Sequence, residues 1–255
     1  MRKFRNAGGQ CALFLVCLLT GQASAQENGR YNWVGAYGGV HLGYGRSGSN
    51  ISIAPADANT IADWGLVIGA GAQPTSLSSE PSGFLGGLQV GYNWRSGPIV
   101  YGVEADVSRS GVEDHQTVSN QLPGFLANVT AVASSLDWLS TIRARAGVLL
   151  SPELLLYATG GLAFGHVEHS FSGGFPAEPS LTSGSASRIE TGWTVGAGAE
   201  YALSRTLTLR GEYLYYDLGD TKFQTQGGNP LDKTFFNAQA DNSGHMLRAA
   251  LNFKF

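Results

Sequence analysis

Residues 99–108 read IVYGVEADVS, a stretch in which, from Tyr101 on, apolar side chains alternate with small or polar ones. Successive side chains of a β-strand point to opposite faces, so a period of two indicates a strand with one apolar and one polar face. The apolar face would carry Tyr101, Val103, Ala105 and Val107, and the other face Gly102, Glu104, Asp106 and Ser108. This segment is therefore predicted to be a strand that separates two different environments.

Seven other segments alternate in the same way, which makes eight predicted strands. Each is about as long as a tilted strand must be to cross a bilayer, roughly 10 residues. An even number of antiparallel strands is typical of bacterial outer-membrane barrels. The predicted strands are residues 33–44, 84–94, 99–108, about 136–149, 154 to about 167, 191–201, 207–218 and 245–255.

The connections between these strands alternate in length. Residues 45–83, 109–135, 168–190 and 219–244 are long, polar connections, whereas short turns follow the second, fourth and sixth strands. Outer-membrane barrels combine short periplasmic turns with long extracellular loops. The sequence thus predicts an all-β fold, an eight-stranded antiparallel up-and-down transmembrane β-barrel over residues 26–255, with both ends of the mature chain in the periplasm.

Aromatic residues fall near both ends of the predicted strands, which is typical of the two interfacial girdles of a membrane barrel. A soluble lipocalin-like barrel or sandwich would explain the alternation but not this placement. The girdle nearer the short turns would contain Trp33, Tyr92, Trp94, Tyr101, Tyr157, Tyr201, Phe253 and Phe255, and the girdle nearer the long loops Tyr44, Phe84, Trp138, Phe164, Trp193 and Tyr215.

Residues 1–25 are predicted to be a secretory signal peptide. Basic residues at positions 2, 3 and 5 precede an apolar run at 11–19 and small residues at 23–25. The apolar run is shorter than the roughly 20 residues that a membrane-spanning helix needs, which disfavours a retained anchor. Both cysteines, Cys11 and Cys17, lie in this segment. The mature chain would then have no thiol for catalysis, metal binding or a disulfide.

Eight charged residues on the predicted inward faces, four acidic and four basic, could pair with one another, and Asp137 at the start of the fourth predicted strand falls on the same face as Arg143 and Arg145. Charges inside a narrow barrel must be compensated, and an eight-stranded interior is just wide enough for side chains to fill. The pattern favours a lumen closed by salt bridges over a gated or narrow pore. The predicted charge network comprises Glu104, Asp106, Arg143, Arg145, Glu200, Arg210, Glu212 and Arg248.

The histidines match no known metal motif. His166, Glu168 and His169 cluster at the end of the fifth predicted strand and His41 points inward, but their spacing differs from that of helical zinc motifs. We interpret them as ordinary loop and lumen residues, with metal or haem binding as the alternative. No nucleophile and base stand together at a strand end, and no basic stripe suits nucleic acid. The sequence predicts no enzyme activity, no metal, no cofactor and no nucleic-acid partner.

Several motifs resemble the small outer-membrane β-barrel surface antigens of the porin family, which are similar to the OmpA-type transmembrane domain. The motifs are WVGAYGG at 33–39, GVEAD at 102–106, TIRAR at 141–145 and GEYLYYDLG at 211–219. The alternating apolar end of the chain, with Leu251, Phe253 and Phe255, resembles the C-terminal insertion signal that the barrel-assembly machinery reads.

The resemblance implies a structural, surface-exposed protein of a Gram-negative outer membrane that contributes to envelope integrity. Expected partners are outer-membrane lipid and lipopolysaccharide, the barrel-assembly machinery during insertion, and host or ligand molecules that contact the long loops. Two alternatives stay open: a weak diffusion porin for small solutes, and a haem-binding or adhesive surface protein that acts through its loops.

Overall fold

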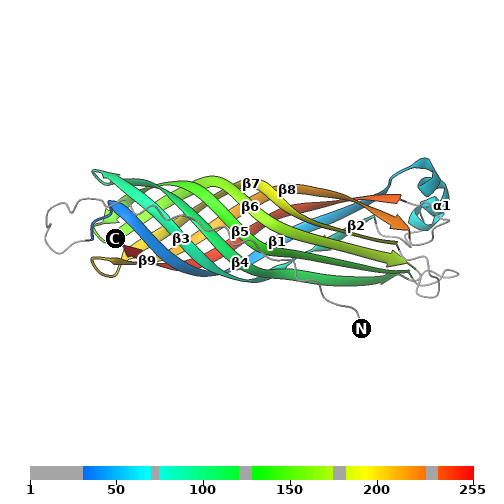
Figure 1. Ribbon diagram of the computed structural model, residues 1–255, viewed down its shortest axis with the longest axis horizontal. Helices are drawn as coiled ribbons and strands as arrows, with labels where there is room; N and C mark the ends of the chain where they lie inside the picture. The colour runs from blue at the N-terminus through cyan, green and yellow to red at the C-terminus, as the bar shows by residue number, and fades with distance from the viewer. Residues whose placement is uncertain (1–30, 70–74, 121–127, 175–181, 228–234) are drawn as a thin grey trace, which may run out of the picture.

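The computed structural model describes residues 31–69, 75–120, 128–174, 182–227 and 235–255 as an elongated barrel of antiparallel strands (Figure 1). The predicted signal peptide lies outside the described residues. The elements are β1 (Gly35–Pro55), α1 (Ala58–Gly69), β2 (Ser76–Ser79), β3 (Ser82–Ser96), β4 (Ile99–Asn120), β5 (Asn128–Ser151), β6 (Leu154–Gly174), β7 (Thr182–Ala202), β8 (Leu207–Gly227) and β9 (Phe235–Lys254).

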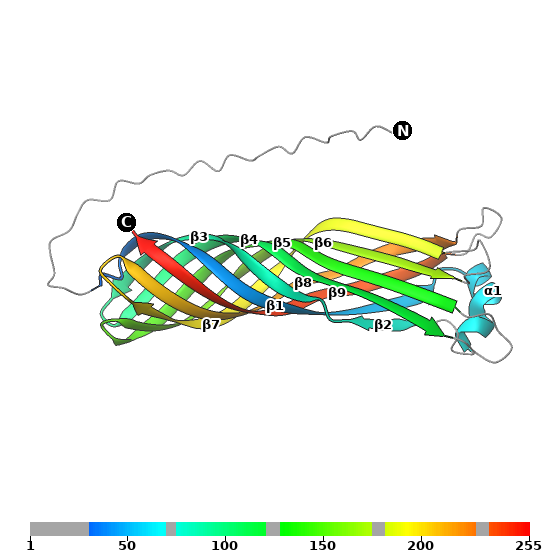
Figure 2. The ribbon, with the colours of Figure 1, turned by 90° about the horizontal axis from the view of Figure 1, so that it is seen from below.

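Eight of these strands close into a ring. From β3 to β9 each strand pairs with the next one along the chain, β1 pairs with β3, and β1 also pairs with β9 to close the barrel. All pairs are antiparallel, which confirms the predicted eight-stranded up-and-down barrel. The short β2 adds only to the outer part of β1. Figure 2 shows α1 at one end of the barrel and the C-terminus at the other.

The strands of the ring are longer than predicted, at 15 to 24 residues. Residues 45–83, 109–135, 168–190 and 219–244 were expected to be loops, but strands continue far into each of them, and β4 and β5 reach 22 and 24 residues. The first of these segments also contains α1 and β2. The prediction missed these extensions because their alternation is inverted. Apolar residues such as Ile51 and Phe171 point inward there, and small polar residues point outward.

A band of exposed apolar side chains surrounds the half of the barrel that carries the short turns. Val40, Leu88, Val103, Ile142 and Leu251 are each at least 44% exposed. In water such a surface would be unfavourable, whereas lipid chains accommodate it. Exposed aromatic residues mark its borders, among them Tyr44, Phe84, Trp94, Tyr101, Trp193 and Phe253.

Two residues assigned to the girdles are instead buried. Trp33 lies before β1, is 2% exposed, and its indole N–H donates to the backbone oxygen of Pro152 at 3.0 Å. Tyr157 occupies an inward position of β6 and is 3% exposed. The girdle prediction is wrong for both, because proximity to a strand end does not reveal the face to which a side chain points.

The interior is filled in layers. Proceeding from the short turns, the inward residues of β6 are Leu155 and Tyr157, then Ala163 and Val167, then His169 and Phe171. Leu155 and Tyr157 belong to an inner apolar cluster, and Ala163 and Val167 belong to a middle apolar cluster. His169 belongs to a polar layer, and Phe171 to an outer apolar cluster. The charged residues lie between the inner and middle clusters. The lumen is therefore more apolar than the sequence analysis expected.

Three inward tyrosines each lie directly opposite a glycine of the next strand. The pairs are Tyr37 with Gly91, Tyr157 with Gly198, and Tyr216 with Gly244. A Cβ atom at any of these glycines would overlap the phenol ring. The missing side chain thus provides the space into which each ring packs across the barrel wall.

We predict that Gly91→Ala lowers the free energy of unfolding by about 1 to 3 kcal/mol, the usual range for overpacking a buried site. The Tyr37 ring that it would displace is fixed by a hydrogen bond to Glu104. Urea unfolding in lipid vesicles would measure the change. Gly211→Ala is the matched control, because Gly211 also lies within a strand but a methyl group added to it would have no other atom within 4 Å. Equal stability of both variants would contradict the packing account.

Candidate functional site

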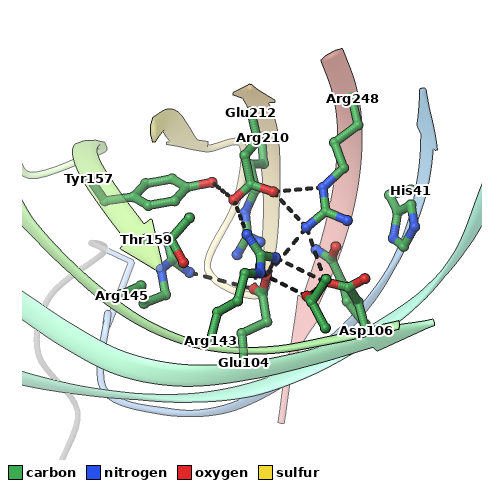
Figure 3. Close-up of polar contacts among 12 residues, drawn as sticks. His41, Glu104, Asp106, Arg143, Arg145, Tyr157, Thr159, Arg210, Glu212 and Arg248 are labelled. Atoms are coloured by element: carbon green, nitrogen blue, oxygen red, sulfur yellow. Dashed lines mark hydrogen bonds and ion pairs between the residues drawn. The ribbon is translucent and has the colours of Figure 1, made fainter. Parts of the chain in front are cut away.

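The candidate site is a buried charge cluster inside the membrane-embedded half of the barrel (Figure 3). Its residues occupy alternate inward positions of five strands, and each is at most 5% exposed. The structure brings together all eight residues of the predicted network: Glu104 and Asp106 on β4, Arg143 and Arg145 on β5, Glu200 on β7, Arg210 and Glu212 on β8, and Arg248 on β9.

Arg143 lies at the centre of the cluster. Its guanidinium contacts Glu104 at 2.5 Å, Asp106 at 3.0 Å and Glu212 at 3.1 Å. Glu104 is its direct neighbour across the β4–β5 ladder, whereas Glu212 reaches it from β8 on the other side of the lumen. Arg143 therefore links its neighbouring strand in the wall to a strand on the other side of the lumen.

The other three arginines extend the network around Arg143. Arg248 binds Glu212 at 2.6 Å and Asp106 at 3.2 Å. Arg145 and Arg210 both bind Glu200, at 2.7 Å and 3.1 Å, and Arg210 also binds Glu104. Each carboxylate therefore has at least one arginine partner, as the cost of burying an isolated charge requires.

Two tyrosines complete the cluster. The Tyr37 hydroxyl donates to Glu104 at 2.5 Å and accepts from Arg145 at 3.1 Å, and the Tyr157 hydroxyl donates to Glu212 at 2.7 Å. The Arg145 guanidinium also lies 4.1 Å from the centre of the Tyr157 ring, a cation–π distance. Sequence analysis assigned Tyr157 to the girdle. Tyr157 and Thr159 are two positions apart on β6, so their side chains point to the same face. The polar Thr159 was therefore the signal that could have placed Tyr157 inside the barrel.

Neutral side chains donate to two of the carboxylates, although Oδ1 of Asp106 has no hydrogen-bond partner among the described residues. Thr208 and Asn252 donate to Glu200 at 2.6 and 3.0 Å, and Thr141 donates to Asp106 at 2.6 Å. His41 lies in the same layer, where its ring nitrogen is 2.8 Å from the Ser108 hydroxyl. These contacts fix the cluster in one arrangement. Because its acids are held by arginines, the cluster can neutralise charge and fill space, but it offers no free carboxylate to act as a base.

The described residues with metal-ligand geometry lie elsewhere, on the outer wall. Asp137, His166 and Glu168 bring their potential ligand atoms within 4.8 Å of one another. The prediction that Asp137 faces the lumen is wrong, because its carboxylate lies beside His166 on the outer wall. His169, which was grouped with His166 and Glu168, instead points inward and is 4% exposed.

The predicted insertion-signal residues lie on the outward face at the end of the barrel that carries the short turns. Leu251, Phe253 and Phe255 are exposed, and the Phe253 and Phe255 rings contact each other edge to face. Their role in insertion stays a prediction. Within the ranges that the structure describes, no helix is long and apolar enough to cross a membrane.

Comparison with known proteins identifies a family for most of the chain. Residues 12–242 match the family model described as "Outer membrane protein beta-barrel domain". The chain is 33% identical over 228 residues to the 31 kDa outer-membrane immunogenic protein of Brucella melitensis, covering 88% of this chain and 85% of that protein. It is 27% identical to the 25 kDa outer-membrane immunogenic protein of Brucella abortus, covering 80% and 74%.

A solved structure supports the same fold. The outer membrane protein OprG of Pseudomonas aeruginosa superimposes with a TM-score of 0.56 at 15% sequence identity, covering 88% of this chain and 98% of that protein. At this identity the similarity concerns the fold alone.

We predict that Arg248→Met lowers the free energy of unfolding by about 3 to 5 kcal/mol, because it leaves buried carboxylates without their partner. The double variant Glu212→Met, Arg248→Met removes one charge of each sign and should lose much less. Urea unfolding followed by tryptophan fluorescence would measure both. Leu247→Met, on the outward face of β9, is the control and should change little. A single variant as stable as the double variant would refute the role of charge pairing.

We also predict that acid loosens the outer extension around His169. Burial holds the pKa of His169 below its ordinary value, although Asn242 and Glu190 partly oppose this. The neutral ring accepts from Ser134 at 3.0 Å and donates to Asn242 at 2.8 Å. Since the unfolded histidine takes up its proton near pH 6.5, stability is complete above that pH and decreases below it. Amide exchange near Asn242 should accelerate at pH 5, and His169→Gln should remove this pH dependence; an unchanged pH dependence would contradict the assignment.

Proposed function

The chain belongs to the family of outer membrane protein beta-barrel domains, and we propose that it serves as a structural, surface-exposed outer-membrane protein that contributes to envelope integrity with a closed lumen. The observation that carries this proposal is the filling of the interior. Arg143 joins carboxylates from two sides of the lumen by direct ion pairs, and apolar clusters lie on either side of the charge cluster. A solute could pass through the lumen only if the residues of the charge cluster and those of the apolar clusters moved apart.

In this proposal the short turns and both ends of the mature chain face the periplasm, and the extended parts of the strands stand outside the cell. The difference between the apolar outer surface near the short turns and the polar outer surface of the extensions supports this orientation. The apolar band lies near the short turns, whereas the extensions have polar outward faces. Long segments on the extracellular side are the rule in this class of barrel.

The proposal excludes catalysis at the charge cluster. Each acid of the cluster is paired with arginine, and the tyrosine hydroxyls are committed to carboxylates. A general base or nucleophile must instead be free to reach a substrate atom. The lumen therefore functions as a support for the barrel wall.

The proposed partners follow from the outer surface. Lipid chains would cover the apolar band, and the exposed Arg109, directly opposite Trp138 in the β4–β5 ladder, suits the anionic headgroups of lipopolysaccharide. The barrel-assembly machinery would act during insertion, through the outward face that carries Leu251, Phe253 and Phe255. Host or ligand contacts would fall on the extensions and on α1, where Ile61 is 57% exposed.

We predict that cells without this protein become more sensitive to detergent and to large hydrophobic antibiotics. Expression of the wild-type chain should restore resistance without faster uptake of a small chromogenic β-lactam, because the lumen is closed. Uptake that rises in proportion to the amount of protein would favour the porin alternative. Unaltered sensitivity in the deletion strain would contradict the role in envelope integrity.

A further inference from the structure

A cluster of polar residues on the outer wall is left unused by the proposed function. It contains Asp137 from β5, His166 and Glu168 from β6, and Ser187 from β7, so it spans three adjacent strands. His166 and Glu168 are two positions apart and share a face, and Ser187 lies directly opposite Glu168 in the β6–β7 ladder. These residues form no recognisable sequence motif, because Asp137 is distant in sequence from the others and was predicted to face the lumen.

A β-bulge brings Asp137 to this face. Asp137 has no partner in the ladder with β6, which passes from Leu136 opposite Val167 to Trp138 opposite His166. The register with β4 shifts at the same place. A bulge inserts one extra residue and redirects its side chain, a device that is frequent near binding sites. Regular alternation from Leu139 and Thr141 would instead point the Asp137 carboxylate into the barrel.

The hydrogen bonds of the cluster leave an unfilled position between His166 and Asp137. The Ser187 hydroxyl donates to Glu168 at 3.0 Å and lies 3.1 Å from Nε2 of His166. With that proton committed to Glu168, the Nε2–H of a neutral His166 donates to Ser187. The ring's Nδ1 lone pair then faces the Asp137 carboxylate at 3.3 Å. Two acceptors that face each other need a proton or a metal cation between them, and with a second carboxylate nearby the position suits a divalent cation.

The charge of the cluster leads to the same conclusion. Asp137 and Glu168 bring two carboxylate side chains to the same position. Among the residues that the structure describes, no arginine or lysine lies within ion-pair distance of either carboxylate. The cluster therefore has an excess of acceptors and of negative charge, in contrast to the balanced network in the lumen.

We propose that Asp137, His166 and Glu168 bind a divalent transition-metal ion of the Zn²⁺ class. Zn²⁺ binds imidazole nitrogen and carboxylate oxygen at about 2.0 to 2.2 Å, so two of its tetrahedral ligands lie about 3.4 Å apart. The 3.3 Å between His166 and Asp137 fits this spacing. Glu168 lies within 4.8 Å of both and closes the site by rotating its side chain.

Ser187 acts as a positioning residue in this site. Its hydroxyl fixes the tautomer of His166 and holds the Glu168 carboxylate nearby, as hydrogen-bonded partners of metal ligands commonly do. Three protein ligands leave a fourth position for water or another external oxygen. The site is thus built to bind an ion at the wall, and not to bury it completely.

The location allows an ion to enter from outside the cell. The His166 and Asp137 side chains are 23% and 34% exposed, and Glu168 is more exposed still. Ile189, at the outer border of the apolar band, lies directly opposite His166 on β7. Beyond it, Glu168 and Ser187 line a depression of about 430 Å³ together with Glu113 and His115.

The test is a titration of the tag-free, full-length mature protein, refolded in detergent, with Zn²⁺ and then with Co²⁺. We expect one Zn²⁺ per chain by calorimetry and the visible absorption bands of tetrahedral Co²⁺. His166→Ala should abolish the Co²⁺ bands and weaken Zn²⁺ binding at least about 100-fold, and Ser187→Ala about 10- to 100-fold, the usual range for a residue that supports a ligand.

The isosteric variants Asp137→Asn and Glu168→Gln keep the packing and should also lose the Co²⁺ bands. His245→Ala is the matched control, because His245 lies on the outer face and its ring contacts Tyr213, not a carboxylate. Heat-modifiable gel mobility verifies folding of every variant. Absence of Zn²⁺ binding by the wild-type protein, or equal binding by wild type and all three ligand variants, would overturn the proposal.

Discussion

The mutual neutralisation of four acids and four arginines inside an eight-stranded barrel governs the rest of this structure. The interior of such a barrel is just wide enough for side chains, so charges that enter it must find partners or leave the fold unstable. Arg143 meets this constraint by joining Glu104 on the neighbouring strand to Glu212 across the lumen. These ion pairs thus stabilise the barrel wall from inside, in the part of the barrel that lipid surrounds.

The remaining layers of the interior lie on either side of the charge cluster. On one side, Trp33 and Tyr157 close the end of the barrel that carries the short turns, and on the other side apolar clusters continue outward into the long extensions. The outer wall is apolar beside lipid and polar beyond it. The interior therefore supports the barrel, and the surfaces most available for contacts are the extensions, α1 and the outer wall near His166.

Much of this architecture could be predicted from the sequence, because a lipid-facing strand has an alternation with a period of two. The inward charges were predictable for the same reason. The extensions were not, since their alternation is inverted, with residues such as Phe171 inside and serines outside. Trp33 and Tyr157 were misplaced because strand ends do not reveal orientation. Asp137 was misplaced because a bulge adds one residue and reverses the parity of β5, and nothing in the local sequence marks it.

The central claim is that the paired charges close the lumen. Planar-bilayer recording of the purified full-length barrel, with a general diffusion porin reconstituted in parallel, tests it most directly. The account predicts no stable channel from this protein under conditions in which the porin conducts. Large, long-lived conductance steps from correctly folded protein would contradict it.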